Sequence, residues 1–379
     1  MDKKICIISQ AIFPADQPRA FRATELAKEL ARKGYDVVLY AVLGVFDYSS
    51  FEKEFNIKVK NIGKMWFATL NSDNNERRNF IDKVLGKLLH RLIEYPNIEF
   101  MFRMPGILRK EKNIYLLISS AHPHPIHWGC AAARSFFQKK FPQIWIADCG
   151  DPYMGNKFFK KKPLFYFRYL EEWFCAKADY ITIPIEGAKD GYYPKFHDKV
   201  KIIPQGFQFN DIDINTCPPN NQVPTFAYAG VFYKGFRDPS IFLQYLTTIK
   251  RPFKFIIYTQ NQSIIKPYLS LLYGRIEVRQ YIPRNELLKI LSNMDFLINI
   301  ENGTLVHSPS KLIDYAIAKR PILSFSPDVV PRTAFEEFLN GNYAQQFVVK
   351  DVDQYRIESI AERFISLMKN METPSEDYF

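Results

Sequence analysis

One stretch of the chain combines hydroxyls, a cation and a carboxylate at spacings that suit a nucleotide. A helix is predicted to begin at SPSK because Ser308 is a good N-cap and Pro309 costs nothing at the first helical position. The free N–H groups of this helix start, the hydroxyls of Ser308 and Ser310, and the Lys311 ammonium all favour a bound phosphate. Asp314, one turn later, can accept hydrogen bonds from two sugar hydroxyls. Phosphate and ribose together indicate a nucleotide; the alternative is an ordinary capped helix with a Lys311–Asp314 ion pair.

A second stretch, GVFYKGFRDP, begins at Gly230 and carries Lys234 and Arg237. It follows an apolar run at 225–229 that is predicted to be a strand. Because the carboxyl ends of parallel strands meet at one edge of a sheet, we expect these cations on the same edge as the helix start at 308–311. Together they could bind a diphosphate and stabilise it as it departs. The alternative is an ordinary surface turn.

Two loops in the first half of the chain are also rich in polar groups. The loop SSAHPHPIHW holds His122, His124 and His127, and the loop ADCGDPY holds Asp148 and Asp151. Asp151 could accept or orient a hydroxyl proton, or it could simply be a turn residue. A zinc site at the histidines is disfavoured because the intervening prolines stiffen the backbone and no carboxylate or cysteine completes the set.

Arg19 and Arg22 lie near the start of the first predicted helix, at the end of the loop that follows the first predicted strand. This loop is at the carboxyl end of a strand, where α/β proteins bind ligands. The two guanidinium groups could therefore face a phosphate across a cleft. They could equally be solvated surface charges.

The elements that must position these groups alternate between strands and helices, which predicts an α/β fold of two doubly wound, Rossmann-like domains facing a cleft. The predicted strands of the first domain are 4–9, 36–43, 114–119, 144–148 and 180–183. Those of the second are 225–229, 253–259, 277–281, 296–300, the apolar run that begins at Pro321, and 346–349. The predicted domains are 1–203 and 204–353, separated by the Pro- and Gly-containing hinge KIIPQGF.

Residues 51–112 fit this alternation least well, and we predict a basic insertion there. The segment holds 13 Lys and Arg against 8 Asp and Glu, a net charge of +5. Within it, FIDKVLGKLLHRLIEYP predicts a basic amphipathic helix. Such a helix either packs on its own domain or lies, through residues 80–95, against an anionic membrane surface.

Composition narrows the class of partner. The chain has 379 residues, a net charge of +11 and a pI near 9.2, so anionic partners are expected. Nucleic acid is disfavoured because no Arg/Lys tract or aromatic nucleic-acid motif is present. Five scattered cysteines indicate reduced thiols, no apolar run approaches a membrane span, and the N-terminus suits a first strand better than a signal peptide. We therefore expect a cytoplasmic protein, peripheral on the inner face of the membrane if the basic helix binds there.

Six segments, in this order and spacing, make the chain resemble a GT-B glycosyltransferase of the large family 4 group, which makes bacterial surface polysaccharides among other products. They are RATELAKELARKGYDVVLY, WIADCGDP, CAKADYITIPIEGAKD, VKIIPQGF, YAGVFYKGFRDP and SPSKLIDYAIAKRPIL. The resemblance covers nearly everything except residues 51–112. It implies a nucleotide sugar held by the second domain, an acceptor held by the first, and a helix at 354–379 that returns to the first domain.

The resemblance also implies roles for single residues. Asp314 matches the carboxylate that binds the ribose, Lys311 belongs to the phosphate-binding helix start, and Lys234 matches the cation at the departing diphosphate. The expected donor-binding set is Gly230, Ser308, Ser310, Lys311, Leu312 and Asp314; the catalytic set is Lys234, Arg237, Asp151 and His122; and the acceptor-binding set is Arg19, Arg22 and His124. The expected reaction is metal-independent sugar transfer with retention, to a glycan or lipid-linked acceptor, with no cofactor beyond the donor.

The chain departs from the family pattern at three places. Val306 stands where a second glutamate is usual, Val231 follows Gly230 where arginine is frequent, and PRA replaces a Gly-Gly in the first loop. Two alternatives therefore stay open: a nucleotide-sugar 2-epimerase of the same fold, and a non-catalytic nucleotide-sugar-binding subunit. A dinucleotide-dependent oxidoreductase is disfavoured because no G-x-G-x-x-G follows either opening strand.

Overall fold

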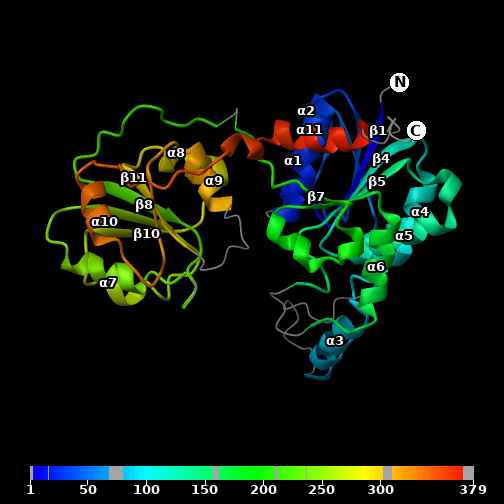
Figure 1. Cartoon of the computed structure of the whole chain (residues 1–379), viewed down its shortest axis with the longest axis horizontal. Coiled ribbons are helices and arrows are strands. Elements are labelled where there is room, and N and C mark those ends of the chain that lie inside the picture. The colour runs from blue at the N-terminus through cyan, green and yellow to red at the C-terminus, as the bar shows by residue number, and fades with distance from the viewer. Residues whose placement is uncertain are drawn as a thin grey trace. The chain divides into compact units, whose positions relative to one another are not determined.

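The structure is a computed structural model that describes residues 3–15, 17–67, 80–156, 162–209, 212–235, 237–301 and 310–369, with the backbone alone at 80–83 and 310. The chain divides into two compact units. Unit 1 comprises Met1–Phe207 and Arg356–Phe379, and unit 2 comprises Gln208–Tyr355. Each unit is a parallel sheet with helices on both faces (Figure 1), so the predicted α/β class with two doubly wound sheets is confirmed.

The sheet of unit 1 has seven strands in the order β3-β2-β1-β4-β5-β6-β7. Their bounds are Lys4–Ile8 (β1), Asp36–Ala41 (β2), Ile57–Asn61 (β3), Ile114–Ser120 (β4), Ile144–Asp148 (β5), Tyr180–Ile183 (β6) and Val200–Ile202 (β7). Each neighbouring pair is parallel. The strand order reverses direction between β1 and β4, so the loops that follow these two strands are where a ligand is expected.

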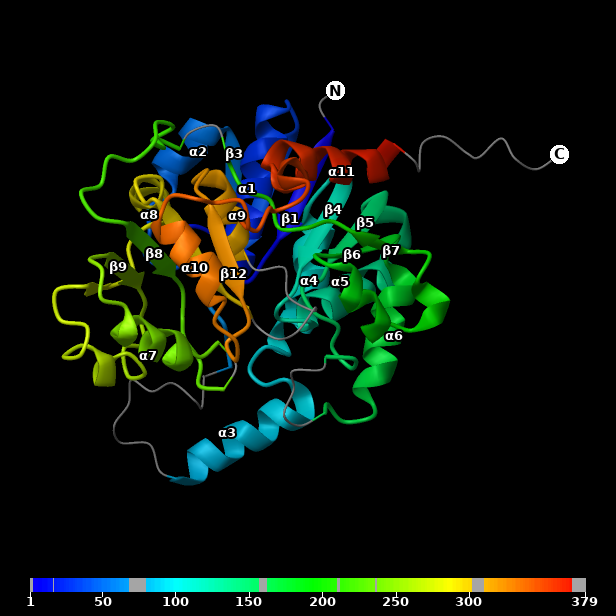
Figure 2. The ribbon, with the colours of Figure 1, turned by 60° about the vertical axis from the view of Figure 1, so that its left-hand side comes forward.

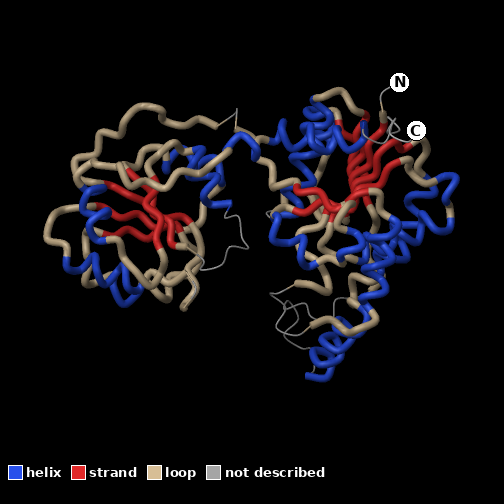
Figure 3. Tube along the Cα trace, viewed as in Figure 1, coloured by secondary structure: helices blue, strands red, loops and turns tan. Residues whose placement is uncertain are grey.

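Helices cover both faces of this sheet, which is why β1, β4 and β5 are almost continuously apolar (Figure 3). One face is covered by α1 (Pro18–Arg32), α2 (Ser49–Phe55) and α11 (Ile357–Lys369). The other is covered by α4 (Glu99–Lys110), α5 (Pro125–Phe136) and α6 (Phe167–Lys177). α4 can lie directly on α5 because Gly129 has no side chain: a Cβ there would be 2.7 Å from Met104 Cβ.

Much of the segment 51–112 is part of the unit 1 fold rather than an addition to it. β3 forms the edge of the sheet, and α4 buries Phe100, Met104 and Leu108 in the core. The amphipathic helix is present as α3 (Phe80–Ile93). Figures 1 and 2 both show α3 standing apart from the helices that cover the sheet. Within the described part of 51–112, α3 is therefore the element that behaves as an insertion.

Unit 2 has a five-stranded parallel sheet in the order β10-β9-β8-β11-β12. The strands are Thr225–Ala229 (β8), Lys254–Tyr258 (β9), Ile276–Arg279 (β10), Phe296–Ile300 (β11) and Ile322–Phe325 (β12). One face is covered by α7 (Ser240–Thr248) and α10 (Arg332–Leu339), the other by α8 (Arg284–Leu291) and α9 (Ser310–Ile317) (Figure 1). The carboxyl ends of β8 and β9 and the start of α9 thereby share one edge.

One predicted strand of unit 2 is wrong. Residues 346–349 are not a strand, although the Phe347 N–H does donate to Ile322 O on β12 at 2.7 Å. Their side chains are largely exposed, with Val348 at 67%. An apolar run alone could not reveal that this segment follows β12 without a continuous ladder of hydrogen bonds.

Candidate active site

A cavity of about 290 Å³ lies in unit 2, beside the carboxyl ends of β8 and β9 and the first turns of α9. It is lined by Ala229, Gly230, Val231, Tyr258, Thr259, Gln260, Tyr281, Ile282, Leu287, Leu291, Lys311, Asp314 and Tyr315. Three of the predicted donor-binding residues, Gly230, Lys311 and Asp314, are therefore brought together. The mixed apolar and polar lining is typical of a small-molecule site.

The backbone at the end of β8 forms one wall of this cavity. Gly230 has a φ of +147°, where a side chain would be strained, and its N–H donates to Tyr258 O at 2.9 Å. The Ala229 N–H donates to the Tyr315 hydroxyl at 2.8 Å, which fixes β8 against α9. Tyr315 is fully buried, so this wall is rigidly held.

Lys311 supplies a buried amine that has no acceptor among the described residues. Its Nζ makes no hydrogen bond with the described residues and lies 4.5 Å from the centre of the Tyr228 ring. Burial, and then the nearby Arg237 charge, lower the pKa of Lys311 well below its usual value. The Lys311 amine and the Arg237 guanidinium thus meet at the end of β8. A bound anion would raise the pKa of Lys311 again and supply the missing acceptor.

Asp314 faces the same cavity and is held from the neighbouring helix. Arg284 Nε donates to Asp314 Oδ1 at 2.8 Å, and Arg284 Nη2 lies 2.7 Å from the same oxygen. Burial raises the pKa of Asp314, and the Arg284 charge acts in the opposite direction. The partner of Asp314 is therefore Arg284, and the Lys311–Asp314 ion pair of an ordinary capped helix is not found.

Of the remaining predicted residues of unit 2, Arg237, Lys234 and Leu312 are not in the lining of the cavity. Arg237 Nη1 donates to Val231 O at 3.3 Å, close to the Tyr228 hydroxyl. Lys234 is exposed on the turn that pairs Tyr233 with Arg237. Leu312 packs with the core between the sheet, α8 and α9. Ser308 lies outside the described residues, as does the side chain of Ser310, whose backbone begins α9.

In unit 1, Arg22 is a buried residue that links α1 to β5 and to the hinge. It is 3% exposed, and its Nε and Nη2 donate to the two oxygens of Asp148, each at 2.7 Å. The same guanidinium donates to Ile203 O at 3.0 Å and Pro204 O at 2.6 Å. Its donors are engaged within the protein, so Arg22 fixes α1 and the hinge to β5 and is not placed to bind an acceptor.

Arg19, His122 and Asp151 gather at the carboxyl edge of the same sheet. Arg19 makes one long contact, 3.5 Å from Nη1 to Asp148 Oδ2, and its guanidinium covers Gly150. His122 is exposed; desolvation and the Arg19 charge lower its pKa, while Asp151 raises it. These three groups can contact a ligand and orient a hydroxyl.

The other two histidines of this loop are buried and neutral. His124 is 1% exposed, and neither ring nitrogen makes a hydrogen bond of regular geometry with the described residues. Burial lowers the pKa of His127 to about 3, and its ring nitrogens lie 2.8 Å from Ser119 Oγ and 3.3 Å from Cys149 Sγ. In the part of the chain that the structure describes, no group of three His, Cys, Asp or Glu side chains is arranged to hold a metal ion.

Some residues at these sites were not anticipated from the sequence. Tyr258 and Tyr315 line the cavity, and Arg284 holds Asp314 beside it. Glu171 holds the loop after β5 by accepting the N–H groups of Tyr153 (2.8 Å) and Met154 (3.2 Å). Tyr258 ends an apolar strand, a position that could have been flagged. The other three act across elements that only the fold brings together.

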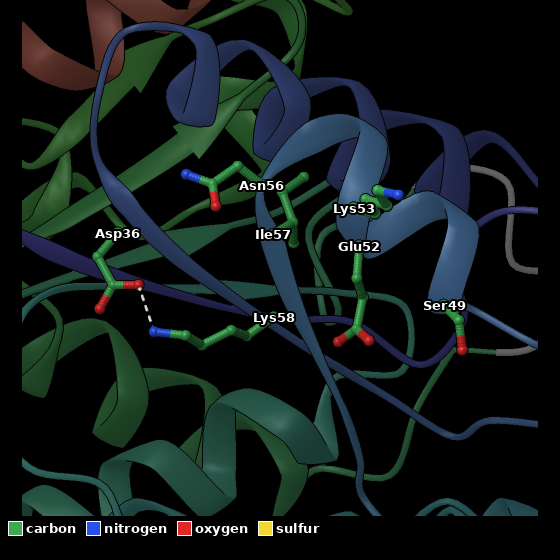
Figure 4. A pocket seen from close by; sticks show the side chains of 7 residues that line it. All are labelled: Asp36, Ser49, Glu52, Lys53, Asn56, Ile57 and Lys58. Carbon is green, nitrogen blue, oxygen red and sulfur yellow. Dashed lines mark hydrogen bonds and ion pairs between the residues drawn. The ribbon is translucent and has the colours of Figure 1, made fainter.

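A second hollow, of about 440 Å³, is no candidate for the active site. It is lined by Asp36, Ser49, Glu52, Lys53, Asn56, Ile57 and Lys58 (Figure 4). Asp36 and Ile57 are the first residues of β2 and β3, so the hollow lies at the amino edge of the sheet. Two of its charges are paired with each other, Lys58 Nζ lying 3.0 Å from Asp36 Oδ1, and Glu52 Oε1 accepts the Val59 N–H at 2.7 Å.

Comparison with known proteins identifies the family. Residues 21–210, half of the chain, match the model of Glycosyltransferase Family 4. The chain belongs to glycosyltransferase family 4. The resemblance noted in the sequence is thereby confirmed, and the protein is a glycosyltransferase that uses a nucleotide sugar. No curated protein sequence matches the chain significantly.

Solved structures that cover nearly the whole family 4 chain support the fold. A glycosyltransferase from Rickettsia africae has a TM-score of 0.64 at 11% identity, over 99% of this chain and 100% of its own. HepE from Anabaena in complex with UDP has a TM-score of 0.59 at 9% identity, over 97% and 100%. UDP-GlcNAc 2-epimerase from Neisseria meningitidis bound to UDP-GlcNAc has a TM-score of 0.55 at 12% identity, over 98% and 100%. At these identities the likeness shows the GT-B fold alone.

Among the described residues of this glycosyltransferase, every helix is too short or too polar to cross a bilayer.

Proposed function

We propose that the chain transfers a sugar from a nucleotide sugar held by unit 2 to a glycan or lipid-linked acceptor held by unit 1, in the synthesis of a surface polysaccharide. One observation carries the donor assignment. Lys311 Nζ is buried without an acceptor, beside a second cation, in a cavity that also presents the Asp314 carboxylate. A diphosphate would satisfy the cations, and a ribose diol would satisfy the carboxylate.

The proposed mechanism uses charge rather than a protein nucleophile. Lys311, Arg237 and the N–H groups at the start of α9 neutralise the diphosphate as the bond between sugar carbon and phosphate oxygen breaks, and Lys234 adds a cation from the exposed turn. The acceptor hydroxyl then attacks the oxocarbenium-like carbon from the face that the diphosphate leaves, which gives retention, and its proton passes to the departing phosphate oxygen. No metal or cofactor takes part in these steps.

On the acceptor side, Asp151 or His122 would orient the attacking hydroxyl, and Arg19 would bind the acceptor. His122 has a lowered pKa and so is neutral near pH 7, which suits a hydrogen-bond acceptor for that hydroxyl. Arg19 makes one long hydrogen bond, to Asp148, so other N–H groups of its guanidinium can bind an acceptor. His124 lies behind this group with its ring against His122, centroid to centroid 4.8 Å.

We also propose that α3 lies on an anionic membrane surface, which would make the acceptor lipid-linked. Five apolar side chains of α3 are exposed: Val84, Leu85, Leu88, Leu92 and Ile93. Lys87 and Arg91 are exposed on the same helix. A helix with exposed leucines and cations suits the interface of an acidic bilayer.

The Lys311→Ala variant tests the donor assignment. We expect transfer to fall by about 10²- to 10³-fold, because one charge-stabilising donor is lost, and binding of the nucleoside diphosphate to weaken. Lys266→Ala, which removes an exposed lysine of unit 2, is the matched control and should change neither quantity. Transfer by Lys311→Ala at the wild-type rate would refute the assignment.

Incubation with donor alone should yield no epimerised sugar; an epimer would point to a 2-epimerase.

A further inference from the structure

Arg284 is placed to control the donor site without lining it. It is the first residue of α8, and both its Nε and its Nη2 contact a single oxygen, Asp314 Oδ1. Asp314 Oδ2 accepts no hydrogen bond from the described residues, while Asp314 itself lines the cavity. The arginine therefore occupies one carboxylate oxygen and leaves the other without a donor among the described residues.

The pair is mostly removed from water, so its geometry matters. The two side chains are 21% and 20% exposed. Burial raises the pKa of Asp314, and the charge and hydrogen bond of Arg284 oppose that rise. The other titratable groups that line the cavity are Lys311 and the tyrosines at 258, 281 and 315. Without Arg284, the carboxyl would hold a proton at higher pH and would lose its role as a pure acceptor.

We propose that Arg284 is a positioning residue that holds Asp314 with one oxygen presented to the donor ribose, and so sets donor affinity without touching the donor. The inference rests on the proposed role of Asp314 in donor binding. An aspartate is shorter than the glutamate that is usual in the family. Arg284, on α8, would hold this aspartate in place across the contact between α8 and α9.

The test compares Arg284→Gln, Arg284→Lys and Asp314→Asn in the full chain. Donor KM and kcat are measured from pH 5.5 to 8.5, with Lys289→Gln as control, because Lys289 is an exposed cation on the same helix, 2.5 Å from Asp213. We expect Arg284→Gln to raise donor KM about 10-fold at pH 7 with kcat changed less than about 2-fold. The pH below which affinity is lost should also move upward, because Asp314 then protonates more readily. Arg284→Lys should restore part of both effects.

The outcomes separate this inference from the proposed function. If Asp314→Asn leaves donor KM unchanged, the donor site itself is misassigned. If Asp314→Asn weakens donor binding but Arg284→Gln behaves like Lys289→Gln, the role of Arg284 is refuted. A KM increase of equal size at every pH would also refute it, since that indicates only local damage to the fold. Should Arg284→Gln fail to fold, Arg284→Lys carries the test with the same outcomes, at a smaller effect.

Discussion

The Glu111 carboxylate is buried in unit 1 and accepts hydrogen bonds from three side chains. Lys4 Nζ and the Tyr40 hydroxyl each donate at 2.5 Å, and Lys60 Nζ donates to the oxygen that Tyr40 uses. Burial on its own would raise the pKa of Glu111, but these donors outweigh it and lower the pKa from 4.5 to about 2. Stability is therefore linked to the ionisation of this one carboxylate.

Acid should release this stabilisation in a defined window. The folded pKa lies below the unfolded one, so the contribution is complete above pH 4.5 and is lost as pH falls toward 2. It amounts to about 3 kcal/mol at pH 7 and about half of that at pH 3. Glu111→Gln should lower the free energy of unfolding of unit 1 by this amount at pH 7 and by only a few tenths at pH 2.

Tryptophan fluorescence during urea unfolding measures this, because all four tryptophans of the chain, at positions 66, 128, 145 and 173, belong to unit 1. The control is Glu54→Gln, an exposed carboxyl of α2 whose removal should shift the transition at neither pH. A loss for Glu111→Gln that is as large at pH 2 as at pH 7 would show that packing rather than charge is responsible.

At the residue scale, the sequence predicts a site residue when its position in a strand or helix marks it. It does not predict a residue whose role depends on a partner in another element. Gly230, Lys311 and Asp314 sit at strand ends or a helix start, and that position alone indicated a ligand site. Arg284 could not be predicted, because its role depends on α8 packing beside α9, which no local pattern encodes. Arg22 shows the opposite limit: as a charged residue near a helix start it suggested a ligand contact, yet it is buried on Asp148.

At the element scale, buried strands were predicted most closely. β5, β6, β8 and β11 have the predicted bounds, because strands covered on both faces are continuous apolar runs between turns. The sequence IKVKN of β3 lacks that signature, since an edge strand half exposed to water carries lysines. α4 was missed for a related reason: its buried residues are separated by exposed ones within a basic segment.

Among the helices, α3 leads to a test of membrane binding. The protein should cosediment with vesicles that contain phosphatidylglycerol and not with neutral phosphatidylcholine vesicles, because the apolar side chains of α3 insert while its cations meet acidic headgroups. Leu88, 50% exposed, should insert, so Leu88→Glu should weaken vesicle binding at least about 10-fold. Leu269→Glu alters a leucine of unit 2 that is 37% exposed and should have no effect.

Equal sedimentation with the two kinds of vesicle would contradict the charge component of this proposal. Equal loss in Leu88→Glu and Leu269→Glu would contradict the assignment to α3.

At the scale of the whole molecule, unit 2 is inserted into the chain of unit 1. The chain leaves unit 1 at Phe207 and returns at Arg356, and the Ile357 N–H donates to Phe207 O at 2.9 Å. Both ends of unit 2 therefore meet at one place. Unit 2 also has its own two cores, one on each face of its sheet, and the described residues that line the cavity beside Lys311 all belong to unit 2.

These features predict that residues 208–355, expressed alone, fold and bind the nucleotide part of the donor. In a thermal-shift screen of UDP, GDP and ADP, one nucleotide should stabilise the fragment. Saturation at about 100 times the dissociation constant adds about 2.7 kcal/mol, which a melting curve resolves. Asp314→Asn in the same fragment should abolish the shift while leaving the unliganded fragment folded. If the fragment folds but no nucleotide stabilises it, whereas one stabilises the full chain, then donor binding depends on groups outside unit 2, and the cavity beside Lys311 cannot be the whole site.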